Sequence, residues 1–211
     1  MRKLEQRRLS PTDWARAALD AIGRGGIDAV AVETIAAELG ATKGSFYWHF
    51  KNRDALIEAA LGRWEQRCTD AVIVHLEKQP DPGKRLRMIL EGGFERGPTE
   101  RAEIALLANP GHPAAIRAVR RVAERRIGYM ADQLEALGWR RRDAHDRAVL
   151  LAYLYVGHLQ LAHTAPEVTR LDARRRQVKL VFDALVTGTV KTRRAPGEAG
   201  SGNRLSGHGD G

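Results

Sequence analysis

Residues 32–51 read VETIAAELGATKGSFYWHFK, and this stretch decides the fold of the chain. Apolar residues recur at helical spacing on both sides of Gly40, which predicts two short helices joined by a tight turn. Thr42 is a natural N-cap for the second helix. That helix concentrates side chains that bind phosphates and base edges. The stretch therefore predicts a helix-turn-helix that contacts DNA through Thr42, Lys43, Gly44, Ser45, Tyr47, Trp48, His49, Lys51 and Arg53.

A helical wheel separates the two faces of the second helix. Phe46 and Phe50 are four residues apart, so they face inward together. The outward residues are then Gly44, Ser45, Trp48 and Lys51, with Lys43, Tyr47 and His49 on the flanks. Lysine, tyrosine and histidine suit phosphate oxygens, whereas Ser45 and Trp48 suit base edges or thymine methyl groups. The plain alternative is a helix pair that forms part of an ordinary bundle, but two adjacent aromatic residues facing solvent disfavour it.

Capped helices are predicted on both sides of this pair. Ser10 and Asp13 have the spacing of a capping box around Pro11, which suits the first helical position. Asn52 caps a further helix that runs to about residue 76. The three helices up to residue 57 thus form a complete helix-turn-helix head.

The segment from Pro11 to about Trp64 resembles the N-terminal domain of TetR-family transcriptional regulators. The match is carried by GIDAVAVETIAAELGATKGSFYWHFKNRDALIEA at residues 26–59, and its YWHF variant resembles the tetracycline-repressor branch. The resemblance implies a homodimer that binds a palindromic operator in double-stranded DNA. It also implies that the remaining helices form a ligand-binding and dimerisation core, in which an unknown small-molecule effector releases a repressor from its operator.

Two positions depart from the usual pattern of that family. Ala31 stands where serine or threonine commonly caps the helix and touches phosphate, and Glu33 stands where a basic residue is common. Glu33 is interpreted as favouring the helix dipole at an N-terminus. The lost phosphate contacts are expected to be replaced by a basic arm that reaches the minor groove or, alternatively, is only a solvated terminus; its residues are Arg2, Lys3, Arg7 and Arg8.

The whole chain is predicted to be all-α, with about nine helices. We expect a basic N-terminal arm at 1–9, a helix-turn-helix DNA-binding domain at 10–57, a ligand-binding and dimerisation domain at 58–190, and a disordered Gly-rich tail at 191–211. Beyond the fourth helix, the periodicity and the Pro and Gly breaks predict helices at about 84–96, 99–108, 113–137, 143–164 and 171–189.

Composition agrees with this organisation. The 211 residues are 43% hydrophobic and 29% charged, and the net charge of +9 favours polyanionic partners, although RNA or a membrane surface would fit charge alone. No apolar run approaches the ~18 residues of a membrane span, and residues 1–11 lack the apolar core of a secretory signal. Cys68 stands alone, which excludes an intrachain disulfide and a Cys-based zinc site. A cytoplasmic protein without cofactor or metal is expected.

The C-terminal helices supply candidates for the ligand and dimer sites. Mixed aromatic and polar residues inside apolar helices give the ligand candidates Trp64, Cys68, Met88, Phe94, His112, Tyr129, Tyr153 and His158, with Tyr155 beside them; plain core is the alternative for each. Helices 143–164 and 178–190 are apolar around most of their girth, which predicts burial on two sides. The expected dimer contacts are Val149, Tyr153, Gly157, Leu161, Val178, Phe182 and Leu185.

Other features favour no further chemistry. His145, His158 and His163 lack metal-ligand spacing and are interpreted as core or interface residues. The cluster Arg117, Arg120, Arg121, Arg125 and Arg126 is interpreted as a solvated face. A helical enzyme is disfavoured, because the chain has no nucleophile elbow, phosphate-binding Gly loop or dinucleotide fingerprint. A transcriptional activator and a DNA-binding protein without effector remain alternatives to the repressor.

Overall fold

The computed structural model describes residues 9–93, 100–108, 111–168 and 174–188, and within these ranges the regular structure is entirely helical. The helices are α1 (Pro11–Gly25), α2 (Val32–Glu38), α3 (Lys43–Tyr47), α4 (Arg53–Glu65), α5 (Ala71–Leu76), α6 (Pro82–Gly93), α7 (Glu100–Ala108), α8 (Pro113–Ala136), α9 (Arg141–Thr164) and α10 (Arg174–Val181). A π-helical turn, Gln66–Asp70, joins α4 to α5, and a second one, Phe182–Thr187, extends α10. The prediction of an all-α chain is confirmed.

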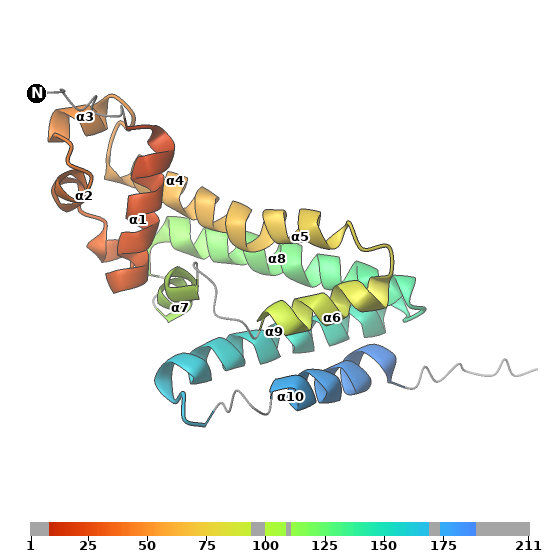
Figure 1. Ribbon diagram of the computed structural model, residues 1–211. Helices are drawn as coiled ribbons and strands as arrows, with labels where there is room; N and C mark the ends of the chain where they lie inside the picture. Colours follow the sequence, from red (N-terminus) through yellow and green to blue (C-terminus); the bar gives the residue numbers. More distant parts are fainter. Residues whose placement is uncertain (1–8, 94–99, 109–110, 169–173, 189–211) are drawn as a thin grey trace, which may run out of the picture.

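Figure 1 shows a small head of α1, α2 and α3 at one end of an elongated body. The continuous rod of α4 and α5 leaves the head and runs alongside α8, while α6, α9 and α10 form the opposite side of the body. Helix α7 packs against α1, next to the head. Glycine eases the close approach of α1 and α7, because a Cβ on Gly23 would lie 3.2 Å from the Cβ of Arg101, which is a tight contact.

Local sequence signals set the helix starts, as predicted. Ser10 and Asp13 form the complete capping box, with Pro11 at the first helical position. Thr42 accepts a hydrogen bond from the Ser45 amide at 3.1 Å, and Asn52 accepts one from the Ala55 amide at 2.9 Å. Ala31 precedes α2 without any side-chain cap.

The head has its own aromatic core. Phe46 is fully buried and lies edge-on to Trp14, with ring centroids 5.5 Å apart, and it stacks on Phe50 at 5.7 Å. Ile35 is also fully buried, as its helical spacing predicted. These contacts fix α3 against α1 and α2, so the remaining face of α3 is held outward.

The buried apolar residues form two clusters. The first joins the head to the beginning of α8 and to α7, and the second lies among α6, the end of α8, α9 and α10. The predicted domain boundary after residue 57 falls inside α4, and Leu56 and Leu61 on either side of it belong to the first cluster. The head is therefore packed onto the body through a shared core. The division at this residue stays a prediction.

Helix α10 and its π-helical extension pack into their own chain. The Arg147 guanidinium lies 3.4 Å from the centroid of the Trp139 ring and donates to the carbonyls of Ala184 and Leu185, while Trp139 Nε1 donates to the Val186 carbonyl at 2.9 Å. These donors satisfy carbonyl groups that a wide helical turn frees.

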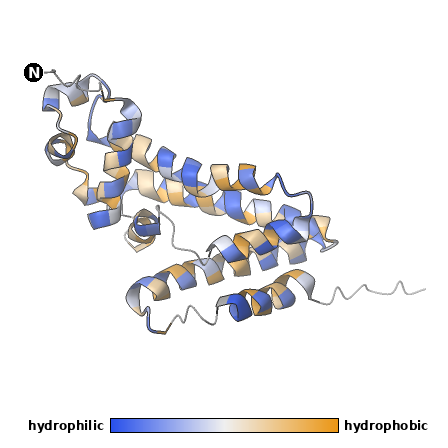
Figure 2. Ribbon diagram, in the orientation of Figure 1, coloured by the Kyte–Doolittle hydropathy of each residue, from blue (hydrophilic) through white to orange (hydrophobic). Residues whose placement is uncertain are grey.

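In Figure 2, hydrophobic and hydrophilic residues alternate along α9, whose first two turns, RRDAHDR, are largely hydrophilic. Among the described helices, none is both long and apolar enough to cross a membrane.

Candidate nucleic-acid interface and internal pocket

The outward face of α3 carries exposed aromatic and basic side chains. Trp48 is 88% exposed and Tyr47 is 56% exposed, although both are large and apolar enough to be buried. Lys43, Gly44 and Lys51 are exposed as well, and Ser45 and His49 are half-buried at the edge of the face. The predicted inward position of Phe46 and Phe50 is confirmed, as is the outward position of Gly44, Trp48 and Lys51. Two details are corrected: Ser45 is half-buried, and α3 ends at Tyr47, so Trp48, His49 and Lys51 lie in the turn that follows it. Their contact with DNA stays a prediction.

An exposed ion pair ties α2 to α3. Lys43 Nζ lies 2.5 Å from Glu33 Oε1, and both side chains are more than half exposed. The hydrogen bond from Lys43 lowers the pKa of Glu33, and the same bond raises the pKa of Lys43. Glu33 lies in the first turn of α2, where the helix dipole favours it. A phosphate would therefore share Lys43 with Glu33, and an exposed pair rearranges at little cost.

Arg53 has a structural task that the sequence did not indicate. Its Nε donates to the Val30 carbonyl and its Nη2 to the Ile27 carbonyl, both at 2.7 Å. Through these bonds Arg53 braces the loop before α2 from the start of α4. Arg53 is half-buried in this position. Only the remaining N–H groups of Arg53 are therefore available for the predicted contact with DNA.

The turn between α2 and α3 has the geometry that glycine allows. Gly40 has a φ of +63°, in the left-handed region, as predicted. Gly44 differs, because a Cβ there would lie 3.7 Å from Thr42 Oγ1, in ordinary contact. The fold itself thus leaves room for a side chain at Gly44. Because glycine has none, the outward face of α3 protrudes less at this position.

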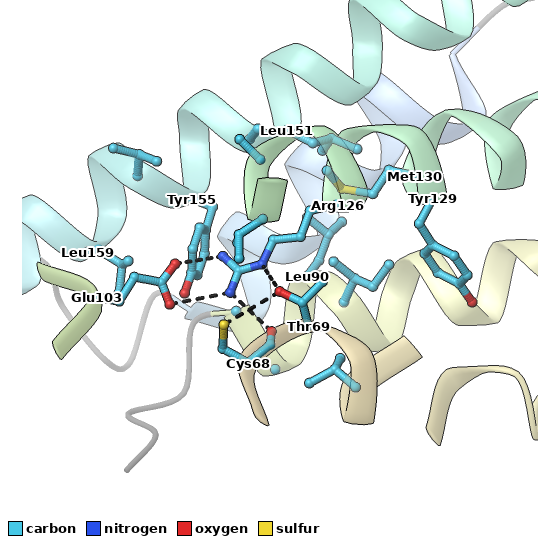
Figure 3. Close-up of a pocket in the computed structure, with 18 of the residues that line it drawn as sticks. Cys68, Thr69, Leu90, Glu103, Arg126, Tyr129, Met130, Leu151, Tyr155 and Leu159 are labelled. Carbon is cyan, nitrogen blue, oxygen red and sulfur yellow. Dashed lines mark hydrogen bonds and ion pairs between the residues drawn. The ribbon is translucent and has the colours of Figure 1, made fainter. Parts of the chain in front are cut away.

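A pocket of about 700 Å³ lies between the two core clusters, and exposed residues such as Val72, His75 and Val156 stand at its open side. Its walls come from α4 and α5 with their π-helical turn, from α6, α7, α8 and α9, and from the end of α10. Most of the lining is apolar, and Figure 3 shows Leu90, Met130, Leu151 and Leu159 around it. A cavity of this size and character suits a small organic molecule.

One polar cluster interrupts the apolar lining. Figure 3 shows the Arg126 guanidinium at its centre. Arg126 Nη1 donates to Glu103 Oε1 at 2.6 Å and Nη2 to Glu103 Oε2 at 3.3 Å. Its Nε donates to Thr69 Oγ1 at 3.1 Å, and Nη2 also donates to the Cys68 carbonyl at 3.0 Å. The ring of Tyr155 lies beneath the guanidinium, 5.2 Å from ring centroid to Cζ. Arg126 thus holds together α7, α8, α9 and the wide turn after α4.

Burial and charge set the protonation states in this cluster. Burial opposes the charged form of Arg126, but the attraction and hydrogen bonds of Glu103 outweigh it, so the pKa of Arg126 is raised. Burial raises the pKa of the Cys68 thiol, and burial followed by the charge of Glu103 raises the pKa of Tyr155. Tyr129 follows the same rule, because burial raises its pKa to about 12. The cluster therefore contains one cation, one anion and neutral thiol and phenol groups at neutral pH.

The structure sorts the predicted ligand residues. The pocket lining includes Trp64, Cys68, Met88, Tyr129, His158 and the neighbouring Tyr155. Two predictions are corrected. Tyr153 is 68% exposed on the far side of α9, and His112 instead caps α8 by accepting the Ala114 amide at Nδ1, 3.2 Å away. Phe94 lies outside the described residues.

Arg126 and Glu103 were missed as pocket residues. Arg126 was grouped with four surface arginines, and that interpretation is wrong for it because only 23% of its side chain is exposed. The sequence does contain a signal, since Arg126 lies four residues from Val122 and four from Met130, on the buried stripe of α8. The other four arginines do lie exposed, in the pairs Arg117–Glu58, Arg120–Glu124, Arg121–Glu65 and Arg125–Asp70.

The predicted dimer residues also divide. On α9, Tyr153, Gly157 and Leu161 are exposed and Val149 is half-buried, as is Leu185 in the π-helical turn after α10. Val178 and Phe182 are corrected, because both are buried in the second core cluster of their own chain. Exposed apolar side chains that the sequence did not single out extend the α9 surface; they are Leu150 and, on α10, Leu180. Leu154 and Val156 are also exposed on α9, but they line the pocket.

The histidines form no metal site in the part of the chain that the structure describes. His158 is half-buried at the pocket, whereas His145 and His163 are exposed on α9. No group of three or more His, Cys, Asp or Glu side chains in the described ranges is arranged to hold a metal ion.

Sequence comparison finds relatives of the head. Residues 16–60 match the family model for bacterial regulatory proteins of the tetR family. The class A tetracycline repressor protein from transposon 1721 of Escherichia coli is 38% identical over 52 residues, which are 25% of this chain and 24% of the repressor. The HTH-type transcriptional regulator BetI of Klebsiella pneumoniae (strain 342) is 28% identical over 117 residues, 53% of this chain and 60% of BetI. The matches span less than two thirds of either relative.

Solved structures match most of the chain. A TetR transcriptional regulator from Legionella pneumophila has a TM-score of 0.70 at 16% identity, covering 83% of this chain and 98% of its own. A transcriptional regulator from Rhodococcus sp. Rha1 has a TM-score of 0.69 at 18% identity, covering 85% and 97%. A protein from Saccharomonospora viridis, solved in complex with choline, has a TM-score of 0.68 at 20% identity, covering 80% and 93%. At these identities the likeness shows the shared fold alone.

Proposed function

We propose that this chain is a bacterial regulatory protein of the tetR family, which its residues 16–60 match, and that it acts as a homodimeric, sequence-specific DNA-binding transcriptional regulator. In the finer form of the proposal it is a repressor, which a small molecule bound in the pocket releases from its operator. The relatives supply the class of function, and the residues of this chain supply the reasons below.

The observation that carries the proposal is the exposed face of α3. A tryptophan that is 88% exposed next to a tyrosine that is 56% exposed leaves a large apolar area in water. The same helix is anchored by the buried Phe46 and has an exposed N-terminus, and an exposed Lys51 follows it in the turn before α4. Aromatic, basic and small residues on a short, rigidly held helix suit the major groove of DNA.

A dimer is proposed because one short recognition helix reads few base pairs. Two heads related by a two-fold axis would place their recognition helices in successive major grooves, about 34–36 Å apart. The exposed apolar surface of α9, with Tyr153 at 68% exposure, offers a self-complementary interface of the kind such symmetry requires.

Ligand control is proposed because the pocket contacts the rod that carries the head. Cys68 and Thr69 line the pocket and lie in the π-helical turn that continues directly from α4. A molecule that shifts this turn would move α4 relative to α8, and with it the head. A coupling of about 1–3 kcal/mol between the two sites is typical of such systems.

DNA selection from a random duplex pool, followed by anisotropy titration of the full chain, tests the proposal. We expect the selected duplex to bind at least about a thousandfold more tightly than a random duplex. Lys51→Ala should weaken binding to both duplexes and reduce the slope of log affinity against log salt concentration by about one. Trp48→Ala and Ser45→Ala should change the sequence preference more than this salt slope. A folded dimer that enriches no sequence would disprove DNA-specific regulation, and equal effects of the three variants on both duplexes would reject the assigned roles.

Gly44→Ala separates folding from DNA approach. The added methyl group meets no atom of the chain closer than 3.7 Å, so the head should fold with unchanged or slightly higher stability, by up to about 1 kcal/mol. If DNA approaches the outward face of α3, the same methyl group should weaken the specific complex by about tenfold or more. Unchanged affinity would show that the DNA backbone and bases do not come close to Gly44.

A further inference from the structure

The pocket has a distinctive balance of charge. Arg126 and Glu103 are the charged groups set into its wall, and only 23% and 5% of their side chains are exposed. Of the other charged residues that line it, Arg67 and Glu91 are exposed and Glu100 is half-buried. His158 is half-buried, and His75 is exposed. The interior charge is therefore one cation paired with one anion.

The hydrogen-bonding capacity of this pair is nearly used up. Arg126 makes four hydrogen bonds, two to Glu103, one to Thr69 and one to the Cys68 carbonyl, and a guanidinium has about five N–H groups to give. The ring of Tyr155 is already covered by the same guanidinium. Neither charge is left as a free partner for a charged group of a ligand.

A charged ligand would therefore pay a large desolvation cost. A carboxylate brought to Arg126 would lie beside the buried carboxylate of Glu103, and an ammonium group brought to Glu103 would lie beside Arg126. Like charges that lie side by side repel strongly where the surroundings are apolar, and a buried charge without a partner is unfavourable. A neutral oxygen can instead share an Arg126 N–H group with the Tyr155 hydroxyl, and it adds no charge.

We propose that the pocket selects uncharged, largely apolar molecules with a carbonyl or hydroxyl oxygen, and that the Arg126–Glu103 pair excludes anions and cations. The proposal deepens the function given above, because it names the chemical class of the effector that would bind in this pocket. The apolar lining provides the affinity, and the closed ion pair provides the discrimination.

Matched seven-carbon chains test the proposal on the full-length protein. The three probes are 2-nonanone, octanoate and heptyltrimethylammonium, which carry the same heptyl chain on an acetyl, a carboxylate or a trimethylammonium group. Titration calorimetry and thermal shift should show 2-nonanone binding at least about tenfold more tightly than either charged probe. Equal binding of a charged probe, or binding of none of the three, would overturn the proposal.

Charge-changing variants give the sharper test. Glu103→Gln keeps the side-chain shape and an acceptor for Arg126 but leaves the guanidinium charge unpaired. The affinity for octanoate should therefore rise at least about tenfold. Arg126→Met leaves the opposite charge and should favour heptyltrimethylammonium instead. Glu100→Gln is the matched control, because Glu100 is a carboxylate on the same helix that lines the pocket but lies closer to solvent. If Glu100→Gln raises the affinity for octanoate as much as Glu103→Gln does, the role of the Arg126–Glu103 pair is overturned.

The outcome can be separated from that of the proposed function. If 2-nonanone binds selectively but the complex with the selected duplex is unaffected, the ligand class stands and the ligand-responsive function fails. If octanoate or heptyltrimethylammonium binds in the pocket and releases DNA while 2-nonanone does neither, the regulatory function stands and the ligand class is overturned.

Discussion

Replacing Arg126 by methionine should destabilise the protein far more than replacing its neighbour Arg125. Arg126 is the centre of a buried cluster, and its removal leaves the carboxylate of Glu103, a residue that is 4% exposed, without its ionic partner. Methionine keeps most of the apolar stem, so lost packing contributes little. The loss is therefore almost entirely that of the charge and its hydrogen bonds.

The expected magnitude follows from the burial of the pair. Removing one partner of a buried ion pair costs about 3–5 kcal/mol. For a chain of this length, 1 kcal/mol corresponds to a Tm change of about 2–4 °C, so Arg126→Met should lower the Tm by about 6–20 °C. Arg125 pairs with Asp70 at 3.7 Å, with 63% and 56% of the side chains exposed. Arg125→Met should therefore cost less than about 1 kcal/mol.

Chemical denaturation and thermal unfolding of the two variants beside the native protein provide the assay. Lowering the pH from about 8 to about 5.5 adds a second readout. A buried carboxylate without a partner takes up a proton more readily when folded than when unfolded, so the deficit of Arg126→Met should shrink as the pH falls. The reasoning is refuted if Arg126→Met and Arg125→Met cost the same, or if the deficit grows on acidification.

Three further substitutions and one reactivity measurement test separate parts of the structure. Gly40→Ala should cost about 1 kcal/mol in chemical denaturation, because the φ of +63° is strained for alanine. Trp139→Phe should cost about 1–3 kcal/mol, because the buried Val186 carbonyl loses its Nε1 donor. Cys68 should react with iodoacetamide more slowly than an unfolded cysteine at pH 7–8, because burial raises the thiol pKa and lowers the thiolate fraction. Tyr153→Glu should dissociate the proposed dimer without unfolding the protomer, as measured by light scattering, because the side chain is 68% exposed.

Each of these has a clear contrary result. Gly40→Ala with native stability would mean that the turn relaxes, and a neutral Trp139→Phe would mean that Val186 finds another donor. Alkylation of Cys68 at the rate of the unfolded chain would show that the pocket opens freely. An intact dimer of Tyr153→Glu would move the interface away from the exposed surface of α9.

The head was predictable because its signals are local. Ser10, Thr42 and Asn52 each cap a helix through a bond to a backbone amide three residues away, so the caps can be found by spacing alone. Gly40 and Phe46 follow from turn geometry and from the four-residue period in the same way. The outward position of Trp48 then follows, because the inward face is already occupied.

The pocket was only partly predictable, because its residues meet across long stretches of chain. Arg126 is 23 residues from Glu103 and 57 from Thr69, and nothing local distinguishes it from the exposed arginines around it. Tyr153 and Tyr155 lie two residues apart on α9, yet one faces solvent and the other faces the pocket. A helix with apolar residues around most of its girth does not reveal which side its own chain will cover.

The sequence by itself thus determined the helices, their caps and the outward face of α3, since capping bonds and helical periodicity act over three or four residues. Only the tertiary structure decided that Arg126 turns inward to Glu103, that Phe182 packs within its own chain, and that the pocket opens onto the turn after α4. These arrangements depend on which distant helices α8, α9 and α10 pack against, and that choice is made by the whole core.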